Sequence, residues 1–421
     1  MHKILSHGLV FGLVAVFAAG CGLARQPSPG AEATAAAEQL AGRSGSVVLP
    51  AGSEFALFAR VFDQVRSFYV DPVDDAALLK AAAAGMRTSF PEPGNVSDAE
   101  LVDAAISGML SSLDPYSAYL GENAYFALQE QTRGQFGGIG LQVGLENEML
   151  KVISPIDGTP AAAAGMQPGD LITHADGFVL RGLTLNDAVM RLRGQVGSQV
   201  RLTVQRNGST PFEVAIKRAV IQIHPVRWSL EDNIGYIRIS TFNARASGEF
   251  VAAVRDILTQ AGPALTGFVI DLRNNPGGLF EQAVFISDVL LEQGQIVSTR
   301  GRAFQQSHAA LPGDISGGLP ITVLINGGSA SAAEILAGAL RDNHRALLIG
   351  EKTYGKGSVQ TIIPFADHDG LRLTTARYYT PSGRTVEGGI DPDIIVANDN
   401  SSEVDTQRER AAAELKRVAG R

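Results

Sequence analysis

The sequence has almost no cysteine, and this scarcity excludes two kinds of site. Cys21 is the only cysteine among 421 residues, so neither an internal disulfide nor a zinc site of paired cysteines can form. The seven histidines form no H-E-x-x-H pattern, and none lies in a motif typical of a catalytic triad. We therefore expect no metal and no cofactor, and we do not expect a histidine base.

Basic residues are in the minority. The chain has 35 Lys and Arg against 43 Asp and Glu, which gives a formal net charge of −8. Phosphate backbones are bound by clustered Lys and Arg, and no such cluster occurs, so we expect no nucleic-acid partner. The hydrophobic content of 45% is ordinary for a folded protein, and the length suggests two or three domains.

Long hydrophobic runs are also missing. The apolar run at 9–19 is shorter than the roughly 17–25 residues of a membrane-spanning helix and has the length of a signal-peptide core. Small residues then precede Cys21, and this arrangement resembles a bacterial lipoprotein signal. The resemblance implies that 1–20 is removed and that Cys21 is lipidated as the mature N-terminus. Ala18 stands where such signals usually have Leu, which leaves ordinary cleavage or a retained anchor open. Gly22 in place of Asp gives no signal for inner-membrane retention.

The rest of the chain changes character several times. A segment rich in Ala, Gly, Ser and Pro cannot bury enough surface to fold. From Phe55, apolar residues at helical spacing follow, and after them come strand-like segments with glycine turns. The last part alternates strands with helices, and this alternation is typical of a mostly parallel sheet. We expect a multidomain α+β protein with a signal peptide at 1–20, a flexible tether at 21–50, a helical N-terminal domain at 51–132, a β-rich domain with two helices at 133–218, an α/β domain at 219–398, and a charged C-terminal tail at 399–421 with a final helix.

Two segments of the α/β domain carry candidate chemistry. Ser331 lies in a loop between a buried strand and a helix, and Lys356 lies between two glycines. Each has a plain structural reading: Ser331 and Glu334 form a good capping box, and Lys356 is a lysine in a surface turn. Residues 350–356 also fit G-x-x-x-x-G-K, but Gly357 stands where a phosphate-binding loop needs Ser or Thr, so we reject nucleotide binding.

Together these segments resemble the carboxyl-terminal processing peptidases, also called tail-specific proteases. The resemblance runs from about Phe55 to Val396 and implies a ClpP/crotonase-like α/β fold for the peptidase domain. In that family Ser331 corresponds to the nucleophile, Lys356 to the general base, and Gln360 to the residue that positions the lysine. Asp271–Gly278, read as DLRNNPGG, matches the oxyanion loop, in which the Gly277 N–H is the expected donor together with that of Ala332.

The residue types suit this chemistry. A serine hydroxyl is a weak nucleophile and needs an adjacent base. Lysine can accept a proton near neutral pH only if burial lowers its pKa. If residues 356–360 are extended, Gln360 projects from the same strand face as Lys356 and can hydrogen-bond its amine.

The β-rich domain at 133–218 resembles a bacterial PDZ domain. The resemblance is carried by GGIGL at 137–141 and by AGMQPGD at 164–170. Such domains add the end of a peptide as a strand, and loop N–H groups bind its terminal carboxylate. The resemblance implies that tails dock at Gly137, Gly138, Ile139, Gly140 and Leu141. Arg193 is a candidate for coupling this domain to the active site, although a partly exposed arginine is more often a salt-bridge partner.

The resulting hypothesis is a serine endopeptidase that cleaves proteins near their C-termini through an acyl-enzyme and docks apolar tails on its PDZ domain. Its partners would be substrates with exposed C-terminal tails, the membrane through the lipid on Cys21, and a second copy of the chain or an activating adaptor. The location would be the bacterial cell envelope, facing the periplasm. Two alternatives stay open: a tail-binding scaffold that is inactive or activated by a partner, and acyl-CoA chemistry on a crotonase-like sheet, which export makes improbable.

Overall fold

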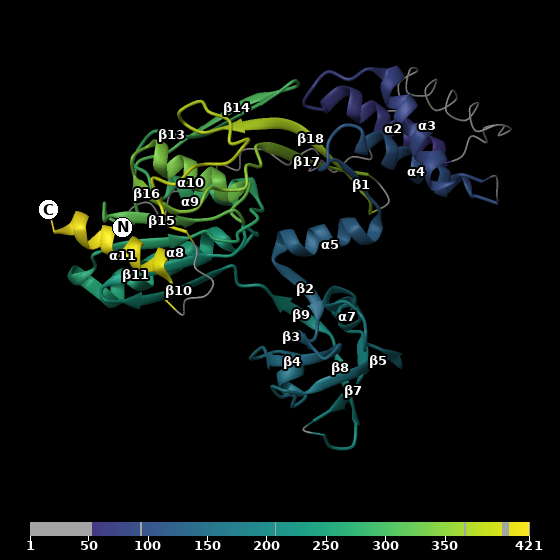
Figure 1. The fold of residues 1–421 in the computed structure, drawn as a ribbon, viewed down its shortest axis with the longest axis horizontal. Helices are drawn as coiled ribbons and strands as arrows, with labels where there is room; N and C mark the ends of the chain where they lie inside the picture. Colours follow the sequence, from purple (N-terminus) through teal and green to yellow (C-terminus); the bar gives the residue numbers. More distant parts are fainter. Residues whose placement is uncertain (1–52, 93–94, 207, 366–367, 398–403, 421) are drawn as a thin grey trace, which may run out of the picture. The chain divides into compact units, whose positions relative to one another are not determined.

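The computed structural model describes residues 53–92, 95–206, 208–365, 368–397 and 404–420. These residues form two compact units, shown in Figure 1. The first unit combines the described residues up to Leu128 with those from Pro225 onward, and the second unit is Gln129–His224. The signal peptide, Cys21 and the tether at 21–50 lie outside the described residues.

A six-stranded sheet is the centre of the first unit. Its order is β10-β11-β12-β15-β16-β19, with all neighbours parallel except β10 and β11. All five residues of both β12 and β15 are buried, which explains their continuous apolar sequences. The expected parallel sheet is thereby confirmed. The strands are β10 (Val226–Glu231), β11 (Ile234–Ile239), β12 (Gly267–Asp271), β15 (Ile321–Ile325), β16 (Ala346–Gly350) and β19 (Ile394–Ile395).

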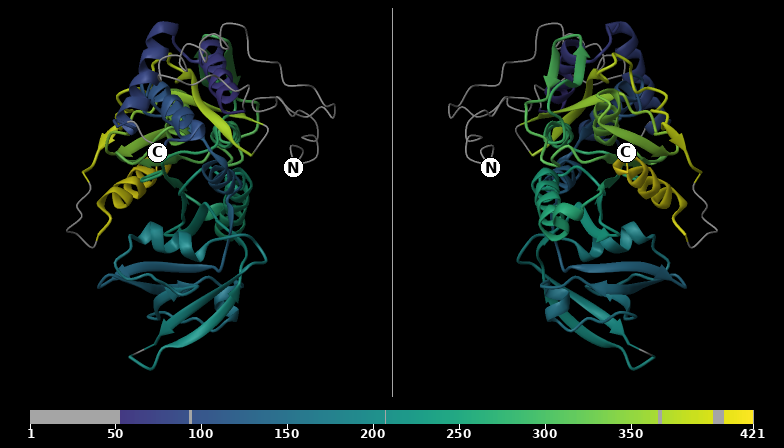
Figure 2. Two further views of the ribbon diagram at one scale, coloured as in Figure 1. Left: turned by 90° about the vertical axis from the view of Figure 1, so that its right-hand side faces the viewer. Right: turned by 90° about the vertical axis from the view of Figure 1, so that its left-hand side faces the viewer.

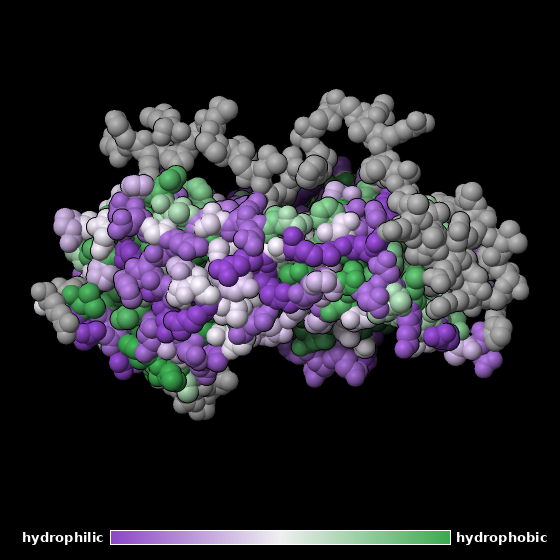
Figure 3. Space-filling view, turned by 90° about the horizontal axis from the view of Figure 1, so that it is seen from above, coloured by the Kyte–Doolittle hydropathy of each residue, from purple (hydrophilic) through white to green (hydrophobic). Residues whose placement is uncertain are grey.

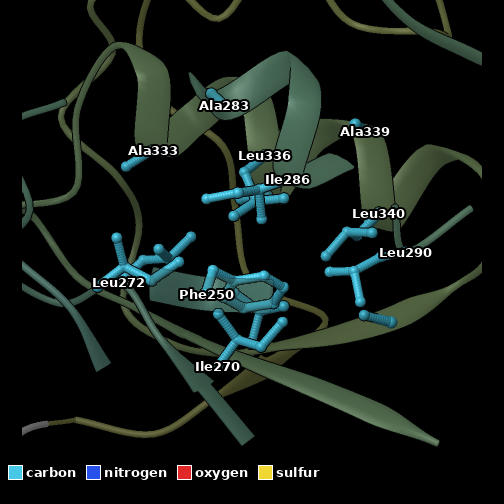
Figure 4. Packing of buried hydrophobic residues seen from close by; sticks show 14 of the residues in the cluster. Phe250, Ile270, Leu272, Ala283, Ile286, Leu290, Ala333, Leu336, Ala339 and Leu340 are labelled. Atoms are coloured by element: carbon cyan, nitrogen blue, oxygen red, sulfur yellow. The ribbon is translucent and has the colours of Figure 1, made fainter. Parts of the chain in front are cut away.

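Helices α8 (Ala246–Ala261), α9 (Phe280–Asp288) and α10 (Ala332–Asp342) pack on this sheet, and the short 3-10 helix η1 (Gly262–Ala264) follows α8. Figure 4 shows the core that results, with Phe250 of α8 and Ile270 of β12 facing Leu336 of α10. Leu336 is completely buried. Because the first residue of α10 follows Ser331 directly, this packing fixes the loop that carries the candidate nucleophile.

The C-terminal segment is a packed helix rather than only a charged tail. Helix α11 (Thr406–Ala419) buries Ala411 and Leu415 against Val269, Leu324 and other residues of the parallel sheet. The remaining residues of the helix are largely polar, which is why its sequence reads as a solvated tail.

A second, antiparallel sheet stands beside the first in the same unit. Its order is β1-β18-β13-β14, and β17 also pairs with β18. The strands are β1 (Ala118–Leu120), β13 (Gln295–Gly301), β14 (Gln305–Ala309), β17 (Ser358–Pro364) and β18 (Gly370–Tyr379). Strand β1 joins β18 although about 250 residues separate them, with Ala118 opposite Arg372.

The helical N-terminal segment does not form a domain of its own, contrary to expectation. Helices α2 (Ser53–Phe68), α3 (Asp75–Ser89) and α4 (Asp98–Ser111) share one hydrophobic core with Leu371 and Leu373 of β18. Helices α3 and α4 cross closely, because a Cβ on Gly85 would lie 2.7 Å from the Gly108 Cα. The segment therefore needs the antiparallel sheet to bury its apolar face.

The second unit contains the strands and the two helices that the sequence predicts. Strands β3-β4-β5-β7-β8 form a sheet in this order, β6 pairs with β5, and β2 pairs with β9. Figure 2 shows the unit in teal from two sides. Its elements are β2 (Gln135–Gly138), β3 (Leu141–Glu146), β4 (Met149–Pro155), α6 (Pro160–Ala163), β5 (Leu171–Ala175), β6 (Phe178–Val179), α7 (Leu185–Leu192), β7 (Gln199–Gln205), β8 (Phe212–Lys217) and β9 (Ala219–Gln222), while α5 (Glu122–Arg133) spans the boundary between the units.

The described surface is mixed in polarity. On the face shown in Figure 3, hydrophilic residues predominate and hydrophobic residues are in small groups. Among the described residues, no helix combines the length and the hydrophobicity that crossing a membrane requires.

Candidate active site

Ser331 occupies a sharp turn between β15 and α10. Its backbone has φ 55° and ψ −116°, a conformation that side-chain-bearing residues rarely adopt. Such strain costs about 1–3 kcal/mol and persists only where the surroundings impose it. A strained serine between a buried strand and a helix is also how several hydrolases expose a nucleophile. The loop lies at the carboxyl end of a parallel strand, where ligands of such sheets usually bind.

Glu334 connects the loop of Ser331 with the loop of Lys356. Its carboxylate is completely buried and accepts hydrogen bonds from the N–H groups of Ser331 (2.8 Å), Gly355 (2.7 Å) and Lys356 (2.9 Å) and from the Thr353 hydroxyl (2.6 Å). The sequence indicated only the bond to Ser331, as half of a capping box. The bonds to the second loop had no sequence signal, since they depend on the fold.

Tyr378 of β18 reinforces this connection. Its buried hydroxyl lies 3.2 Å from the Ser331 carbonyl oxygen, 3.4 Å from the Glu334 carboxylate, and within hydrogen-bonding distance of the Lys356 carbonyl oxygen. Burial and the charge of Glu334 raise the pKa of Tyr378 well above its usual value, so the residue stays a neutral donor. Tyr378 lies near the end of β18, and nothing in the sequence assigned it to the site.

The environment of Lys356 favours the neutral amine. Burial lowers the pKa of Lys356, the positive charge of Arg372 lowers it further, and the carboxylate of Asp114 acts in the opposite direction. The ammonium nitrogen lies 4.7 Å from the centroid of the Tyr116 ring. Gly355 packs so closely that an added Cβ would lie 2.6 Å from the Gly389 nitrogen. Burial therefore favours the neutral amine, as a general base requires, whereas the face of the Tyr116 ring favours the ammonium.

The site residues are assembled without being fully connected. In the described part of the chain, no hydrogen bond joins the Ser331 hydroxyl to the Lys356 amine. The expected bond between Gln360 and Lys356 is likewise missing among the described residues, because the Gln360 amide donates to Ser358 (3.1 Å) and Thr374 (2.9 Å) hydroxyls instead. The roles of Ser331, Lys356 and Gln360 therefore stay predictions.

The two predicted oxyanion donors, Gly277 and Ala332, lie beside Ser331 but differ in their hydrogen bonding. A Cβ on Gly277 would lie 2.9 Å from the Ser331 Cβ and 3.0 Å from the Ala332 nitrogen, so only glycine fits here. The Gly277 N–H donates to the Asn275 side chain at 2.8 Å. The Ala332 N–H, in the first turn of α10, has no hydrogen-bond partner within the described ranges. Ala332 is thus free to act, whereas Gly277 must first leave Asn275.

The predicted oxyanion loop is anchored at its start by charged side chains. Asp271 is fully buried and binds Arg273 at 2.7 Å, and Arg273 also binds Asp405 at the start of α11 at 2.7 Å. Burial alone would raise the pKa of Asp271, but hydrogen bonds and the charge of Arg273 hold it below its usual value. Within the described residues, no group of His, Cys, Asp or Glu is placed to hold a metal ion.

The glycine-rich loop of the second unit joins β2 to β3. Gly140 has φ 80°, and a Cβ there would lie 2.3 Å from the Thr159 side chain, so this turn requires glycine. Gly137 and Gly138 end β2, Ile139 is buried, and Leu141 begins β3. The Gly137 N–H donates to the Glu130 carboxylate at 3.0 Å. Because β3 is at the edge of its sheet, it offers an unpaired side to an added strand.

Arg193 follows α7 in the second unit. Its guanidinium carbon lies 4.1 Å from the centroid of the Phe136 ring, and its buried Nε has no hydrogen-bond partner in the described residues. Arg193 forms no salt bridge within the described residues, although a salt bridge is the more common role of a partly exposed arginine. Its proposed coupling role stays a prediction.

Comparisons with known sequences agree with both domains. The profile of peptidase family S41 matches residues 233–396, and the profile of the PDZ domain matches residues 151–206. The first range contains the candidate nucleophile, base and oxyanion loop, and the second contains β5, β6, β7 and most of β4.

Relatives match over most of the chain. A carboxy-terminal-processing protease of Bartonella bacilliformis is 44% identical over 348 residues, which covers 82% of this chain and 75% of the relative. A carboxyl-terminal-processing protease of Synechocystis is 39% identical over 302 residues, with coverages of 69% and 70%. The solved structure of the photosystem II D1 C-terminal processing protease is 31% identical, covers 82% of this chain and 94% of its own, and superposes with a TM-score of 0.52.

Proposed function

The chain belongs to the carboxy-terminal-processing proteases of peptidase family S41, which are serine peptidases, and we propose that it cleaves proteins near their C-termini through an acyl-enzyme formed on Ser331. The observation that carries the proposal is the buried Glu334 carboxylate, which fastens the Ser331 loop and the Lys356 loop to one point. A shared anchor keeps nucleophile and base at a fixed spacing, and catalysis by a dyad depends on that spacing.

The reaction would proceed in two steps. Neutral Lys356 takes the proton of the Ser331 hydroxyl as the oxygen attacks the peptide carbonyl. Lys356 then gives this proton to the leaving amine as the C–N bond breaks, which leaves an ester on Ser331. In the second step water attacks the ester and Lys356 takes a proton from the water. The bond between the acyl carbon and the Ser331 oxygen then breaks, Lys356 gives the proton to that oxygen, and the carboxylic acid product leaves.

Two N–H groups would stabilise the tetrahedral intermediate. The Ala332 N–H is the first donor, since the start of a helix presents unbonded N–H groups. The Gly277 N–H is the second, once Asn275 releases it. One such donor contributes about 3–4 kcal/mol in a comparable hydrolase. Gln360 would orient the amine of Lys356 after turning from Ser358 and Thr374.

The second unit would dock apolar C-terminal tails. The edge of β3 can pair with an extended peptide, and the N–H groups of residues 137–141 can bind the terminal carboxylate. Two observations support this. The carboxylate of Glu130 already accepts a bond from Gly137, and Leu185 of α7 presents an exposed apolar side chain. Arg193 would couple docking to the active site.

We also propose that Cys21 is lipidated and anchors the protein in the bacterial cell envelope, facing the periplasm. The small residues before the only cysteine support this proposal. Labelling with a radioactive fatty acid tests it: the wild-type chain should incorporate label, and Cys21→Ala should not. Equal label in both would refute a lipid on Cys21.

Cleavage of an unstructured reporter tests the peptidase function. The full-length chain, purified in detergent, should cleave a reporter with an apolar tail and should cleave one with a charged tail more slowly. Ser331→Ala should lose activity by about 10³-fold or more, while Ser247→Ala, at the start of another helix on the same sheet, should not. Retained cleavage by Ser331→Ala would refute the proposal.

A second candidate function is a resting enzyme, or tail-binding scaffold, that an adaptor or a second copy of the chain activates. The observation that favours it is the disconnected dyad, together with the Gly277 N–H held by Asn275. This candidate would be supported if neither the wild-type chain nor Ser331→Ala cleaved the reporter and the wild-type chain nevertheless bound the apolar tail.

A further inference from the structure

A short turn of the N-terminal segment reaches the proposed general base. Residues 114–117 lie between α4 and β1, far from the catalytic segments in sequence. The Tyr116 ring nevertheless lies under the Lys356 ammonium, with 4.7 Å between the nitrogen and the ring centroid. This is within the distance of about 6 Å at which an aromatic face attracts a cation.

The turn is rigid. The Asp114 carboxylate accepts hydrogen bonds from the N–H groups of Tyr116 (2.6 Å) and Ser117 (2.7 Å) and from the Ser117 hydroxyl (2.8 Å). An aspartate that accepts from the N–H groups two and three residues later fixes a local turn. Strand β1 then begins at Ala118 and pairs with β18, which holds the turn against the catalytic sheet.

The same turn also contacts the neighbours of Lys356. The Tyr116 carbonyl accepts a bond of 2.8 Å from Arg372 Nε, and Arg372 is a positive charge near the lysine. The Ser117 hydroxyl accepts a bond of 3.2 Å from the Thr374 N–H, and the Thr374 hydroxyl accepts one of 2.9 Å from Gln360. Directly or through one residue, the turn therefore touches both the base and the residue expected to orient it.

We propose that Tyr116, held by the Asp114–Ser117 turn, is a positioning residue for the general base: its ring holds the Lys356 ammonium in the resting position, away from the Ser331 hydroxyl. This inference rests on the proposed role of Lys356. It assigns the helical N-terminal segment a part in the chemistry in addition to its packing.

Several charged or titratable groups face Lys356. The Tyr116 ring and the charges of Asp114 from the turn and of Arg372 from β18 act on its amine. Glu334 of α10 and Tyr378 of β18 contact its backbone, and Tyr354 of its own loop interacts with Tyr116. The ring face stabilises the ammonium and not the neutral amine. Replacing the ring with an aliphatic side chain of similar bulk should therefore lower the pKa of Lys356, and the acid limb of the rate profile should move to lower pH.

The test compares Tyr116→Leu, Tyr116→Phe and the wild-type chain in reporter cleavage as a function of pH. In Tyr116→Leu the acid limb of kcat/KM should move down by about half to one pH unit, with KM little changed. Tyr116→Phe keeps the ring and should restore the wild-type limb. Phe212→Leu is the matched control, since that ring lies 5.4 Å from a cation, Arg206, that takes no part in the reaction.

A second readout does not require activity. In the Ser331→Ala background, the reactivity of Lys356 toward an amine reagent is measured against pH by mass spectrometry. The midpoint should fall in Ser331→Ala/Tyr116→Leu relative to Ser331→Ala. An unchanged midpoint and an unchanged acid limb in Tyr116→Leu would overturn the role of Tyr116 while the peptidase function stands. Full cleavage by Ser331→Ala would overturn the peptidase function instead.

Discussion

Replacing Glu334 with Gln should separate the two catalytic loops. One carboxylate oxygen accepts from the Thr353 hydroxyl and the Gly355 N–H, and the other accepts from the N–H groups of Ser331 and Lys356. In Glu334→Gln the amide NH₂ fits best at the oxygen that faces Thr353 and Gly355, because the Thr353 hydroxyl can turn and accept a hydrogen bond from it. The NH₂ would still face the Gly355 N–H, a second donor. The remaining hydrogen bonds would go to a neutral oxygen instead of a charged one.

The expected loss of stability follows from these hydrogen bonds. A buried N–H left without an acceptor costs about 1–3 kcal/mol, and a hydrogen bond to a neutral acceptor contributes about 1 kcal/mol less than one to a charged acceptor. The neutral amide has a smaller desolvation penalty, which offsets part of this loss. We expect Glu334→Gln to lower the free energy of unfolding by about 2–4 kcal/mol. We also expect kcat to fall by about 100-fold, since misplacing catalytic groups by about 1 Å has effects of that size.

Urea unfolding and reporter cleavage measure the two effects. KM should change little, because tail docking does not involve Glu334. Glu409→Gln is the matched control, since Glu409 is an exposed glutamate that also lies in the first turn of a helix. An unfolding free energy and a kcat for Glu334→Gln equal to those of the control would refute the role of this carboxylate as a common anchor.

Three further predictions concern the oxyanion loop, the core and the buried charges. Gly277→Ala should abolish cleavage and lower the free energy of unfolding by about 1–3 kcal/mol, because its Cβ would lie 2.9 Å from the Ser331 Cβ at a φ of 100°; reporter cleavage and urea unfolding followed by circular dichroism measure this. Leu336→Ala should lower the unfolding free energy by about 2–5 kcal/mol in urea, since it empties a completely buried position. The pKa of Asp271 is depressed in the folded state, so its pair with Arg273 stabilises the protein above the unfolded pKa of about 3.9 and is lost as pH falls through the lower folded value. Asp271→Asn should therefore reduce stability at pH 7 and flatten the decline of stability below about pH 5, measured by thermal unfolding.

Each of these predictions has a matched control. Gly248→Ala adds a Cβ that meets nothing within 4 Å, and it should leave cleavage unchanged. Leu311→Ala changes a side chain that is 57% exposed, and Asp256→Asn changes an exposed aspartate. If any test variant behaves like its control, the corresponding contact does not have the assigned effect.

Much of the fold could be predicted because local patterns and tertiary packing agree. The apolar spacing from Phe55 to Phe68 matches α2, and the buried run at 321–325 is β15. The loop of Ser331 could be located for the same reason, because it joins a fully buried strand to a helix. The family resemblance then supplied Lys356, Gln360 and the oxyanion loop, which lie on other elements.

The features that were missed depend on contacts between distant segments. Strands β13 and β14 are polar and do not alternate clearly, since β14 lies at a sheet edge. The helices α2–α4 read as a separate domain because nothing in their sequence shows that Leu371 and Leu373 complete their core. The contact of Tyr116 with Lys356 could not be predicted for the same reason, because β1 has only three residues and its partner strand comes much later in the chain.

The most direct test of the central claim is a comparison of Ser331→Ala, Lys356→Ala and the double variant with the wild-type chain in reporter cleavage. Residues that act as one unit give non-additive losses. Each single variant should fall to the same low rate, and the double variant should be no slower. Lys352→Ala, an exposed lysine in the same loop, should keep its activity. A single variant that cleaves at a substantial fraction of the wild-type rate, or losses that multiply in the double variant, would contradict catalysis by a Ser331–Lys356 dyad.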